Sequence, residues 1–139
     1  MNVPPGEKLT RFIRYSSHFS IATNRVKPDA FLPHKKSVDV SVFRISGLND
    51  SQELSENDIW EIGQEHVQTE DRPIKARADL LAINVYDSNL EVVPDEPPER
   101  HANIRPLPVD NSPANRKTRR ALATKLANLS KLVIPPEEN

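Results

Sequence analysis

Proline restricts this chain more than any other residue type, since 13 of its 139 residues are prolines. A proline cannot donate a backbone hydrogen bond, so prolines interrupt helices and inner strands. Only 36% of the residues are apolar, which limits the surface that can be buried to offset the entropy of ordering the chain. A chain of this length forms one domain that buries about two-thirds of its unfolded surface. The sequence therefore predicts a small core joined by long connections.

The clearest helix signal is LSENDIWEIG, residues 54–63. Ser55 is a suitable N-cap, and Asp58 three residues later is placed to complete a capping box. The apolar spacing predicts a helix over residues 56–67, with Trp60 as a core anchor. Gly63 in the helix interior costs about 1 kcal/mol relative to alanine, which indicates close packing against another element.

A second helix is predicted over residues 113–133, where Ser112 can cap and Pro113 occupies the first helical position. Leucines at i, i+4 and i+7 form a narrow apolar stripe along it. The opposite side is basic and is our candidate partner-binding face, made of Arg116, Lys117, Arg120 and Lys131.

Strands are predicted from alternating apolar residues. The segment ADLLAINVYDSNLEVVP reads as a hairpin, with strands over 79–85 and 90–93 joined by a turn at 87–89. SVDVSVFRI (37–45) reads as another strand, with Val40 and Val42 on one face and Phe43 and Ile45 on the other. TRFIRY (10–15) is a weaker strand, and HANIRPL (101–107) a short edge strand.

These elements predict an α+β fold, a small mainly antiparallel sheet of four to five strands packed against two helices. We expect a mobile N-terminal tail over 1–8, a single domain over 9–133 and a mobile C-terminal tail over 134–139.

Charge is distributed in blocks, although the formal net charge is only −1. Residues 1–36 hold seven Lys or Arg against two acids, residues 47–71 hold eight Asp or Glu with no Lys or Arg, and residues 111–133 hold six Lys or Arg with no acid. Either the blocks neutralise one another in the fold, or they form a surface that steers a charged partner.

Several kinds of site are excluded by composition. The chain has no cysteine, which removes disulfides, thiolate nucleophiles and cysteine zinc sites and fits a reducing, cytoplasmic compartment. Its three glycines, at positions 6, 47 and 63, cannot build a Walker loop, a dinucleotide fingerprint or a nucleophile elbow. The four histidines have no metal-site spacing, and no apolar run is long enough to span a membrane. We therefore expect no cofactor, no metal and no membrane association.

General acid–base chemistry needs only one or two well-placed groups, so an enzyme stays open as an alternative. The candidate residues follow or lie on predicted strands, and they are His18, Arg44, Arg77 and His101. If they converge, a histidine base and an arginine could serve a metal-independent enzyme acting on RNA or a nucleotide, either RNase-like or an NAD-using transferase.

The segment RYSSHFSIATNRVKPDAFLPH, residues 14–34, is a long connection with no periodicity. Such loops are often functional, but Phe31 and Leu32 can also attach it to the core as a plain connector. In the basic N-terminal region, the aromatic residues Phe12, Tyr15 and Phe19 lie among arginines at 11, 14 and 25, a mixture that would suit nucleic acid. The acidic middle block argues against a dedicated nucleic-acid binder.

No motif in the chain identifies a family. The sequence-based hypothesis is a small cytoplasmic accessory or regulatory protein that binds another protein through charged surfaces. The enzyme and nucleic-acid binding remain alternatives.

Overall fold

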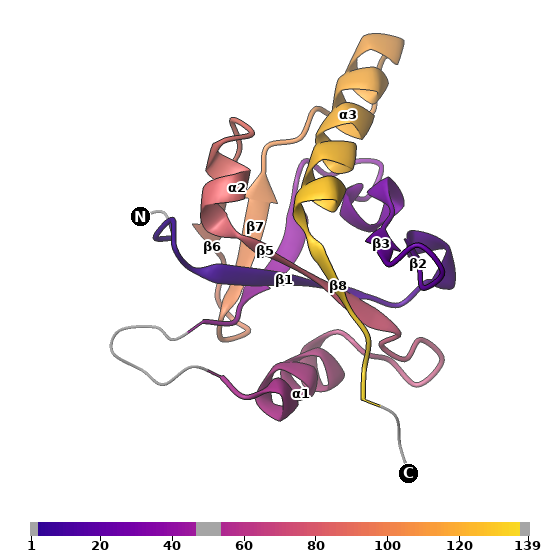
Figure 1. Cartoon of the computed structure of the whole chain (residues 1–139). Helices are drawn as coiled ribbons and strands as arrows, with labels where there is room; N and C mark the ends of the chain where they lie inside the picture. The colour runs from indigo at the N-terminus through magenta and orange to yellow at the C-terminus, as the bar shows by residue number, and fades with distance from the viewer. Residues whose placement is uncertain (1–2, 47–53, 137–139) are drawn as a thin grey trace.

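The computed structural model describes residues 3–46 and 54–136, which form the predicted α+β fold. In this part of the chain one antiparallel sheet has six strands, in the order β6-β7-β4-β1-β5-β8. It is one strand larger than the upper end of the predicted range. Figure 1 shows this sheet with α1 below it and with α2 and α3 above.

The bounds of the elements are as follows. The sheet contains β1 (Lys8–Ile13), β4 (Val40–Arg44), β5 (Ala76–Leu81), β6 (Glu91–Pro94), β7 (His101–Arg105) and β8 (Lys131–Val133). A separate ribbon pairs β2 (Phe19–Ser20) with β3 (Arg25–Val26). The helices are α1 (Glu56–His66), α2 (Ala82–Tyr86) and α3 (Pro113–Leu129), with short 3-10 turns η1 (Ser16–His18) and η2 (Pro28–Phe31).

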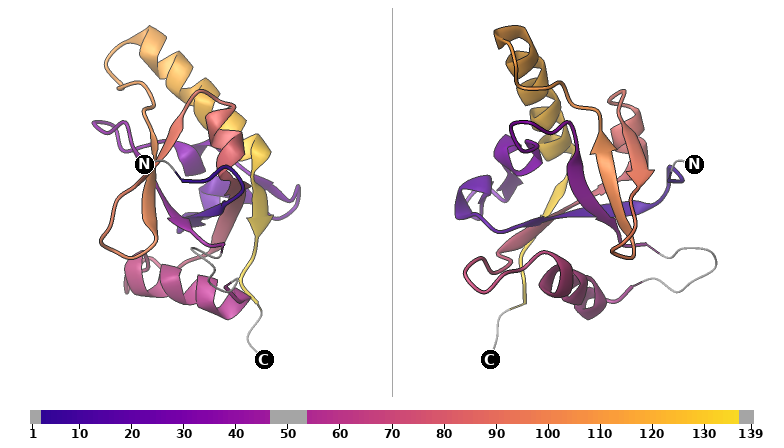
Figure 2. Two further views of the ribbon diagram at one scale, coloured as in Figure 1. Left: turned by 90° about the vertical axis from the view of Figure 1, so that its left-hand side faces the viewer. Right: turned by 180° about the vertical axis from the view of Figure 1, so that it is seen from behind.

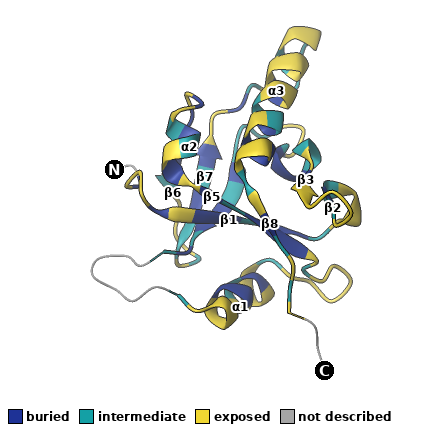
Figure 3. Cartoon of the chain, viewed as in Figure 1, coloured by how far each residue is buried: buried dark blue, intermediate teal, exposed yellow. Residues whose placement is uncertain are grey.

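Each face of the sheet buries an apolar cluster, because alternate strand residues point to opposite faces. The larger cluster joins residues such as Leu9, Val42 and Ile104 to Leu126 of α3. The smaller cluster lies under α1 and contains Phe12, Phe43, Ile45, Ile59 and Trp60. Figure 2 shows α1 and α3 on opposite sides of the sheet, and Figure 3 shows that each helix turns a buried side inward and an exposed side outward.

The prediction for α1 is confirmed. Ser55 accepts from the backbone N–H of Asp58, and the Asp58 side chain accepts from the backbone N–H of Ser55, which is the capping box. Trp60 is buried. A Cβ added to Gly63 would lie 2.7 Å from two ring carbons of Phe12, so glycine here allows α1 to approach the sheet closely.

The predicted hairpin over 79–93 is wrong. β5 ends at Leu81, and residues 82–86 form helix α2, which buries Ala82 and Val85. β5 and β6 are then separated in the sheet by β1, β4 and β7. Val85 lies three residues after Ala82, a spacing that also fits one face of a helix, and the packing of that face decides between the two patterns.

Two further boundaries differ from prediction. The long helix ends at Leu129, and residues 131–133 turn into β8, which pairs with β5. β7 is an inner strand between β4 and β6 instead of an edge strand. On β4, in contrast, the predicted assignment of Val40 and Val42 to one core and of Phe43 to the other is confirmed.

The long segment 14–34 is folded against the sheet. It contains η1, the β2–β3 ribbon and η2, and it buries Phe31 as predicted while Leu32 packs beside the core. Across the described residues, no helix combines the length and the apolar character needed to span a membrane.

Candidate functional site

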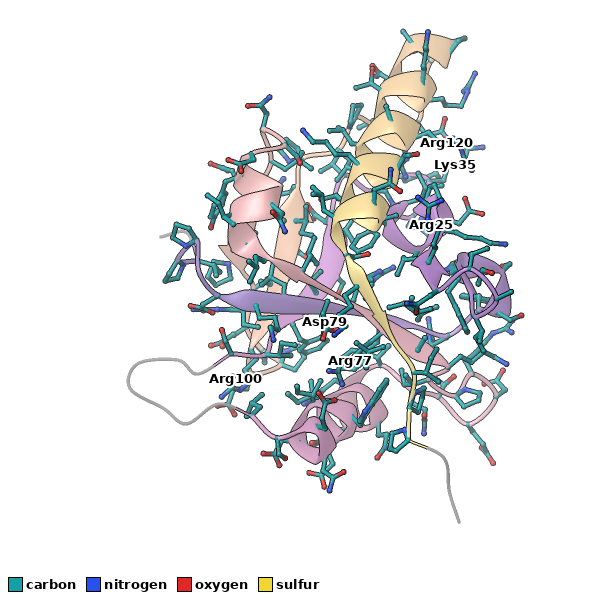
Figure 4. The ribbon with its side chains drawn as sticks, viewed as in Figure 1. Arg25, Lys35, Arg77, Asp79, Arg100 and Arg120 are labelled. Atoms are coloured by element: carbon teal, nitrogen blue, oxygen red, sulfur yellow. The ribbon has the colours of Figure 1, made fainter. Side chains whose placement is uncertain are left out.

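Residues from both basic blocks of the sequence meet on one side of the molecule. α3 packs against η2 and β3, and Figure 4 shows Arg25, Lys35 and Arg120 along that side. We call this region the basic surface, and it is made of the exposed residues Arg25, Lys27, Lys35, Lys36, Arg116, Lys117 and Arg120.

The basic surface keeps most of its positive charge. Arg116 pairs with Asp110 at 3.2 Å and Arg120 pairs with Asp29 at 3.1 Å. The other five members form no ion pair among the described residues. Seven cations against two carboxylates leave an excess of five positive charges on one side of a protein whose formal net charge is −1.

Arg119 holds the basic surface together from inside. Its side chain is buried, with the residue only 4% exposed, and its guanidinium donates to four backbone carbonyls. The acceptors are Pro33 O at 2.6 Å, His34 O at 2.7 Å, Ser37 O at 2.9 Å and Pro108 O at 2.9 Å. α3 is therefore bound directly to the loop that carries Lys35 and Lys36.

Arg11 anchors the same region from the sheet. The register of β1 and β4 pairs Leu9 with Arg44 and Thr10 with Phe43. The next residue of β1, Arg11, donates through its side chain to the carbonyl oxygens of Ser41 at 3.0 Å and Ala30 at 2.9 Å. Burial, together with the nearby charge of Arg14, lowers the pKa of Arg11 to about 10. The side chain remains charged at neutral pH and fixes η2 to the sheet.

The acidic block lies on the opposite side of the sheet. Its described members are exposed on α1 and the turn after it, and they are Glu56, Asp58, Glu61, Glu65, Glu70 and Asp71. None of these acids pairs with a cation of the first 36 residues or of α3 within the described parts of the chain. Because α1 and α3 are separated by the sheet (Figure 2), the acidic block does not pair with the basic surface. Lys8 and Lys131, which belong to the basic blocks by sequence, lie instead on the α1 side beside Glu56.

A second charged feature lies between the sheet and α1. The Arg77 side chain is only 2% exposed and its guanidinium donates to both carboxylate oxygens of Glu56, at 2.7 and 3.2 Å, and to Asp79 at 3.0 Å. It also lies 4.8 Å from the ring centroid of Trp60. The hydrogen bonds from Arg77 hold the pKa of Glu56 below its usual value. Figure 4 shows Arg77 and Asp79 between the sheet and α1.

These residues border a pocket of about 660 Å³ at the ends of β1, β5 and β8. Its charged lining consists of Lys8, Glu56, Arg77, Asp79 and Lys131, and its apolar lining includes Leu81, Leu129 and Ile134. Lys131 lies directly opposite Asp79 in the β5–β8 pair. This residue was predicted on the helix with Arg116, Lys117 and Arg120, but it lies on β8 at the pocket instead.

His101 is hydrogen-bonded to Ser41, with 2.6 Å between Nε2 and Oγ. Its Nδ1 lies 2.8 Å from the carbonyl oxygen of Asp95 and 3.5 Å from that carboxylate. A proton on Nδ1 would leave Nε2 free to accept from Ser41, as a general base requires. An acyl-transfer site also needs a substrate cavity beside the nucleophile, and neither Ser41 nor His101 lines the pocket described above.

The four residues of the enzyme hypothesis occupy separate environments. His18 is the last residue of η1, and its ring centroid lies 5.0 Å from that of Tyr15. Burial lowers the pKa of His18. Arg44 pairs with Glu7 at 2.7 Å, which raises the arginine pKa. Arg77 and His101 share the α1 face of the sheet, but β1 and β4 lie between their strands, a separation of roughly 14 Å at 4.8 Å per strand.

The aromatic residues considered for nucleic-acid stacking are mostly internal. Phe12 and Phe19 are buried in the two apolar clusters. Tyr15 is 39% exposed, and its ring faces the guanidinium of Arg72 at 4.9 Å.

Sequence reasoning missed the two arginines that anchor the basic surface. Arg119 was counted only as part of a basic block, yet it precedes Leu122 and Leu126 by three and seven residues, so it lies on the apolar stripe of the helix. A cation in line with an apolar stripe is a signal of a buried, fully hydrogen-bonded charge. The sequence around Arg11 carries no comparable signal of a buried arginine, because its acceptors, Ala30 O and Ser41 O, are brought beside β1 only by the fold.

Comparisons with known proteins add no family or fold relative, since no family model, no curated protein and no solved structure matches the chain.

Proposed function

We propose that this protein is a cytoplasmic accessory or regulatory protein that binds an acidic surface of another protein through the basic surface. The observation that carries the proposal is that seven cations from two segments distant in sequence lie together on one side of the sheet, with the acidic block on the other side.

Separation of charge of this kind has a physical consequence for association. An excess of five positive charges on one side steers and orients an acidic partner during the approach, and it disfavours approach to the α1 side. Such a field acts over about 10 Å at 0.1 M salt. Orientation before contact is a useful property for an accessory protein that must engage its partner in one pose.

The basic surface is also held rigid enough to present a defined pattern. Arg119 and Arg11 fix α3, η2 and the loop at residues 33–37 through backbone acceptors. A surface that does not have to be ordered on binding loses less entropy and so binds more tightly for a given set of contacts.

A protein partner is favoured over nucleic acid by the surroundings of the basic surface. Phe12 and Phe19, which could have stacked on bases, are buried, and binders of single strands depend on such stacking for much of their affinity. The exposed acids of the α1 side would repel a polyanion that extended beyond the basic surface.

The enzyme alternative has less support, because its four residues do not share a cavity in the described structure. Of the four, only His101 is hydrogen-bonded to a hydroxyl that it could deprotonate, that of Ser41, among the described residues.

The proposal is tested by affinity capture from a lysate of the source cells, with the wild-type protein and a double charge reversal, Lys35→Glu with Lys117→Glu. The matched control reverses Lys75 and Lys125, which are also exposed and have no side-chain hydrogen bond or ion pair among the described residues. Both variants change the net charge by −4, so only the position of the change differs.

We expect the wild type and the control to retain the same acidic protein, and the Lys35/Lys117 variant to lose it. Retention should fall as salt rises and persist after nuclease treatment. Equal retention by all three proteins would contradict the proposal, and loss of all retained material after nuclease treatment would show nucleic acid to be the partner.

A further inference from the structure

The pocket at the ends of β1, β5 and β8 combines exposed apolar side chains with buried charge. Seven large apolar side chains are exposed in the described residues, and three of them, Leu81, Leu129 and Ile134, line this one pocket at 40 to 42% exposure. Single exposed apolar residues are common on protein surfaces, but a group of them in a concavity marks a binding site for an apolar group.

The inner part of the pocket offers a carboxylate receptor. Arg77 presents Nη1 and Nη2 side by side to the two oxygens of Glu56, which is the two-bond geometry that an arginine makes with any carboxylate. Asp79, on the same strand, accepts from Nε at 3.0 Å and from Nη2 at 3.1 Å. These two bonds fix the direction of the guanidinium.

Glu56 and Arg77 differ strongly in exposure. The Glu56 side chain is 67% exposed, whereas the Arg77 side chain is 2% exposed. The exposed Glu56 carboxylate can be hydrated when it leaves the pair, whereas the buried guanidinium cannot, so its loss of a partner is costly unless another carboxylate takes that place. Arg77 cannot leave, because its guanidinium is enclosed by Trp60, Asp79 and the sheet. Rotation of Glu56 would therefore leave Nη1 without its acceptor and Nη2 with Asp79 alone, so the outer edge of the guanidinium would be open to a new carboxylate.

The rim adds positive charge around this position. Lys8 lies opposite Leu81 in the β1–β5 pair, and Lys131 lies opposite Asp79 in the β5–β8 pair. Both lysines are exposed and line the pocket. With Glu56 turned away, Lys8, Arg77 and Lys131 face a single acid, Asp79, and the pocket has a net positive charge.

We propose that this pocket binds a small apolar carboxylate, whose carboxylate replaces that of Glu56 on Arg77 and whose apolar body lies against Leu81, Leu129 and Ile134. The pocket volume of about 660 Å³ falls within the range typical of small-molecule sites. The site is separate from the basic surface, so this inference does not depend on the proposed function.

The chain supplies its own reporter for a test. Trp60 is the single tryptophan, and its ring lies over the Arg77 guanidinium. We suggest titrating the full-length protein with octanoate while following the indole N–H resonance of Trp60 by NMR. Octylammonium, with the same chain and the opposite charge, is the matched control ligand.

Octanoate should shift the Trp60 resonance saturably, and octylammonium should not. Glu56→Gln should tighten octanoate binding about five- to tenfold, since the competing carboxylate is removed. Lys131→Glu should weaken it by at least about tenfold, while Lys117→Glu on the basic surface should leave it unchanged.

The sign of the Glu56 effect separates a receptor from a merely structural ion pair. If the Glu56→Gln protein is folded by circular dichroism and binds octanoate no more tightly than wild type, the proposal is overturned. Equal binding of octylammonium, or no saturable binding of octanoate below about 10 mM, would overturn it as well.

Discussion

Replacing Arg119 by methionine should destabilise the protein strongly, although the substitution removes a charge and adds an apolar side chain. The guanidinium holds four backbone carbonyls, and the bond to Pro33 O is fully buried. A buried acceptor left without a donor costs about 1–3 kcal/mol, and each part-buried bond contributes about 0.5–1.5 kcal/mol. After allowing for the apolar gain of methionine, we expect a loss of about 3–5 kcal/mol, a large share of the stability of a typical domain.

This loss can be read as a shift in the melting temperature. With an unfolding entropy of about 2.1 cal/mol/K per residue, a chain of 139 residues has about 0.29 kcal/mol/K at the midpoint, so the midpoint should fall by about 10–17 °C. Thermal and urea unfolding followed by circular dichroism measure both quantities. Arg120→Met is the matched control, because Arg120 is an exposed neighbour with a single ion pair to Asp29, and it should cost less than about 1 kcal/mol. An Arg119→Met protein within 1 kcal/mol of the control would refute the assignment of Arg119 as the anchor of the basic surface.

Two further predictions concern the core and the long segment. Gly63→Ala should destabilise by about 1 kcal/mol, because overpacking against the Phe12 ring costs more than the helix propensity that alanine gains; urea unfolding would contradict this if the variant were more stable. His18 has a pKa below its usual 6.5, chiefly because of burial, so the folded state binds fewer protons than the unfolded state there. The stability that wild type has relative to His18→Gln should be fully present above pH 6.5 and be lost as the pH falls through the lowered pKa, and identical pH profiles for the two proteins would argue against it.

The sequence predicted the structure correctly where the decisive interactions lie within one helix or strand or on one of its packed faces. The capping box at Ser55, the close approach at Gly63 and the alternation of Val40, Val42 and Phe43 all depend on nearest neighbours or on one packed face. These predictions were therefore confirmed.

Predictions failed where two periods fit the same residues. Ala82 and Val85 fit the spacing of a strand and also that of one helical turn. They are helical because α2 connects two strands that are not neighbours in the sheet and buries both residues. The end of α3 at Leu129 is similar, because Val133 continues the apolar stripe of the helix but lies in β8 instead.

The charge blocks were visible in the sequence, but their meaning was not. Whether two basic segments meet or face an acidic one depends on which side of the sheet each crosses, and this is a property of the topology. The pocket around Arg77 was hidden for the same reason, since its lining comes from strands that are neighbours only in space.

The most direct test of the basic surface is the affinity for the captured acidic protein, measured by titration calorimetry at about 50 and 300 mM salt, where the screening lengths are about 14 and 6 Å. The account predicts that wild type and the Lys75/Lys125 control bind equally and weaken together with salt. The Lys35→Glu with Lys117→Glu protein should bind at least about tenfold more weakly at low salt and show little dependence on salt. Equal affinity of that variant and wild type at both salt concentrations would contradict the account.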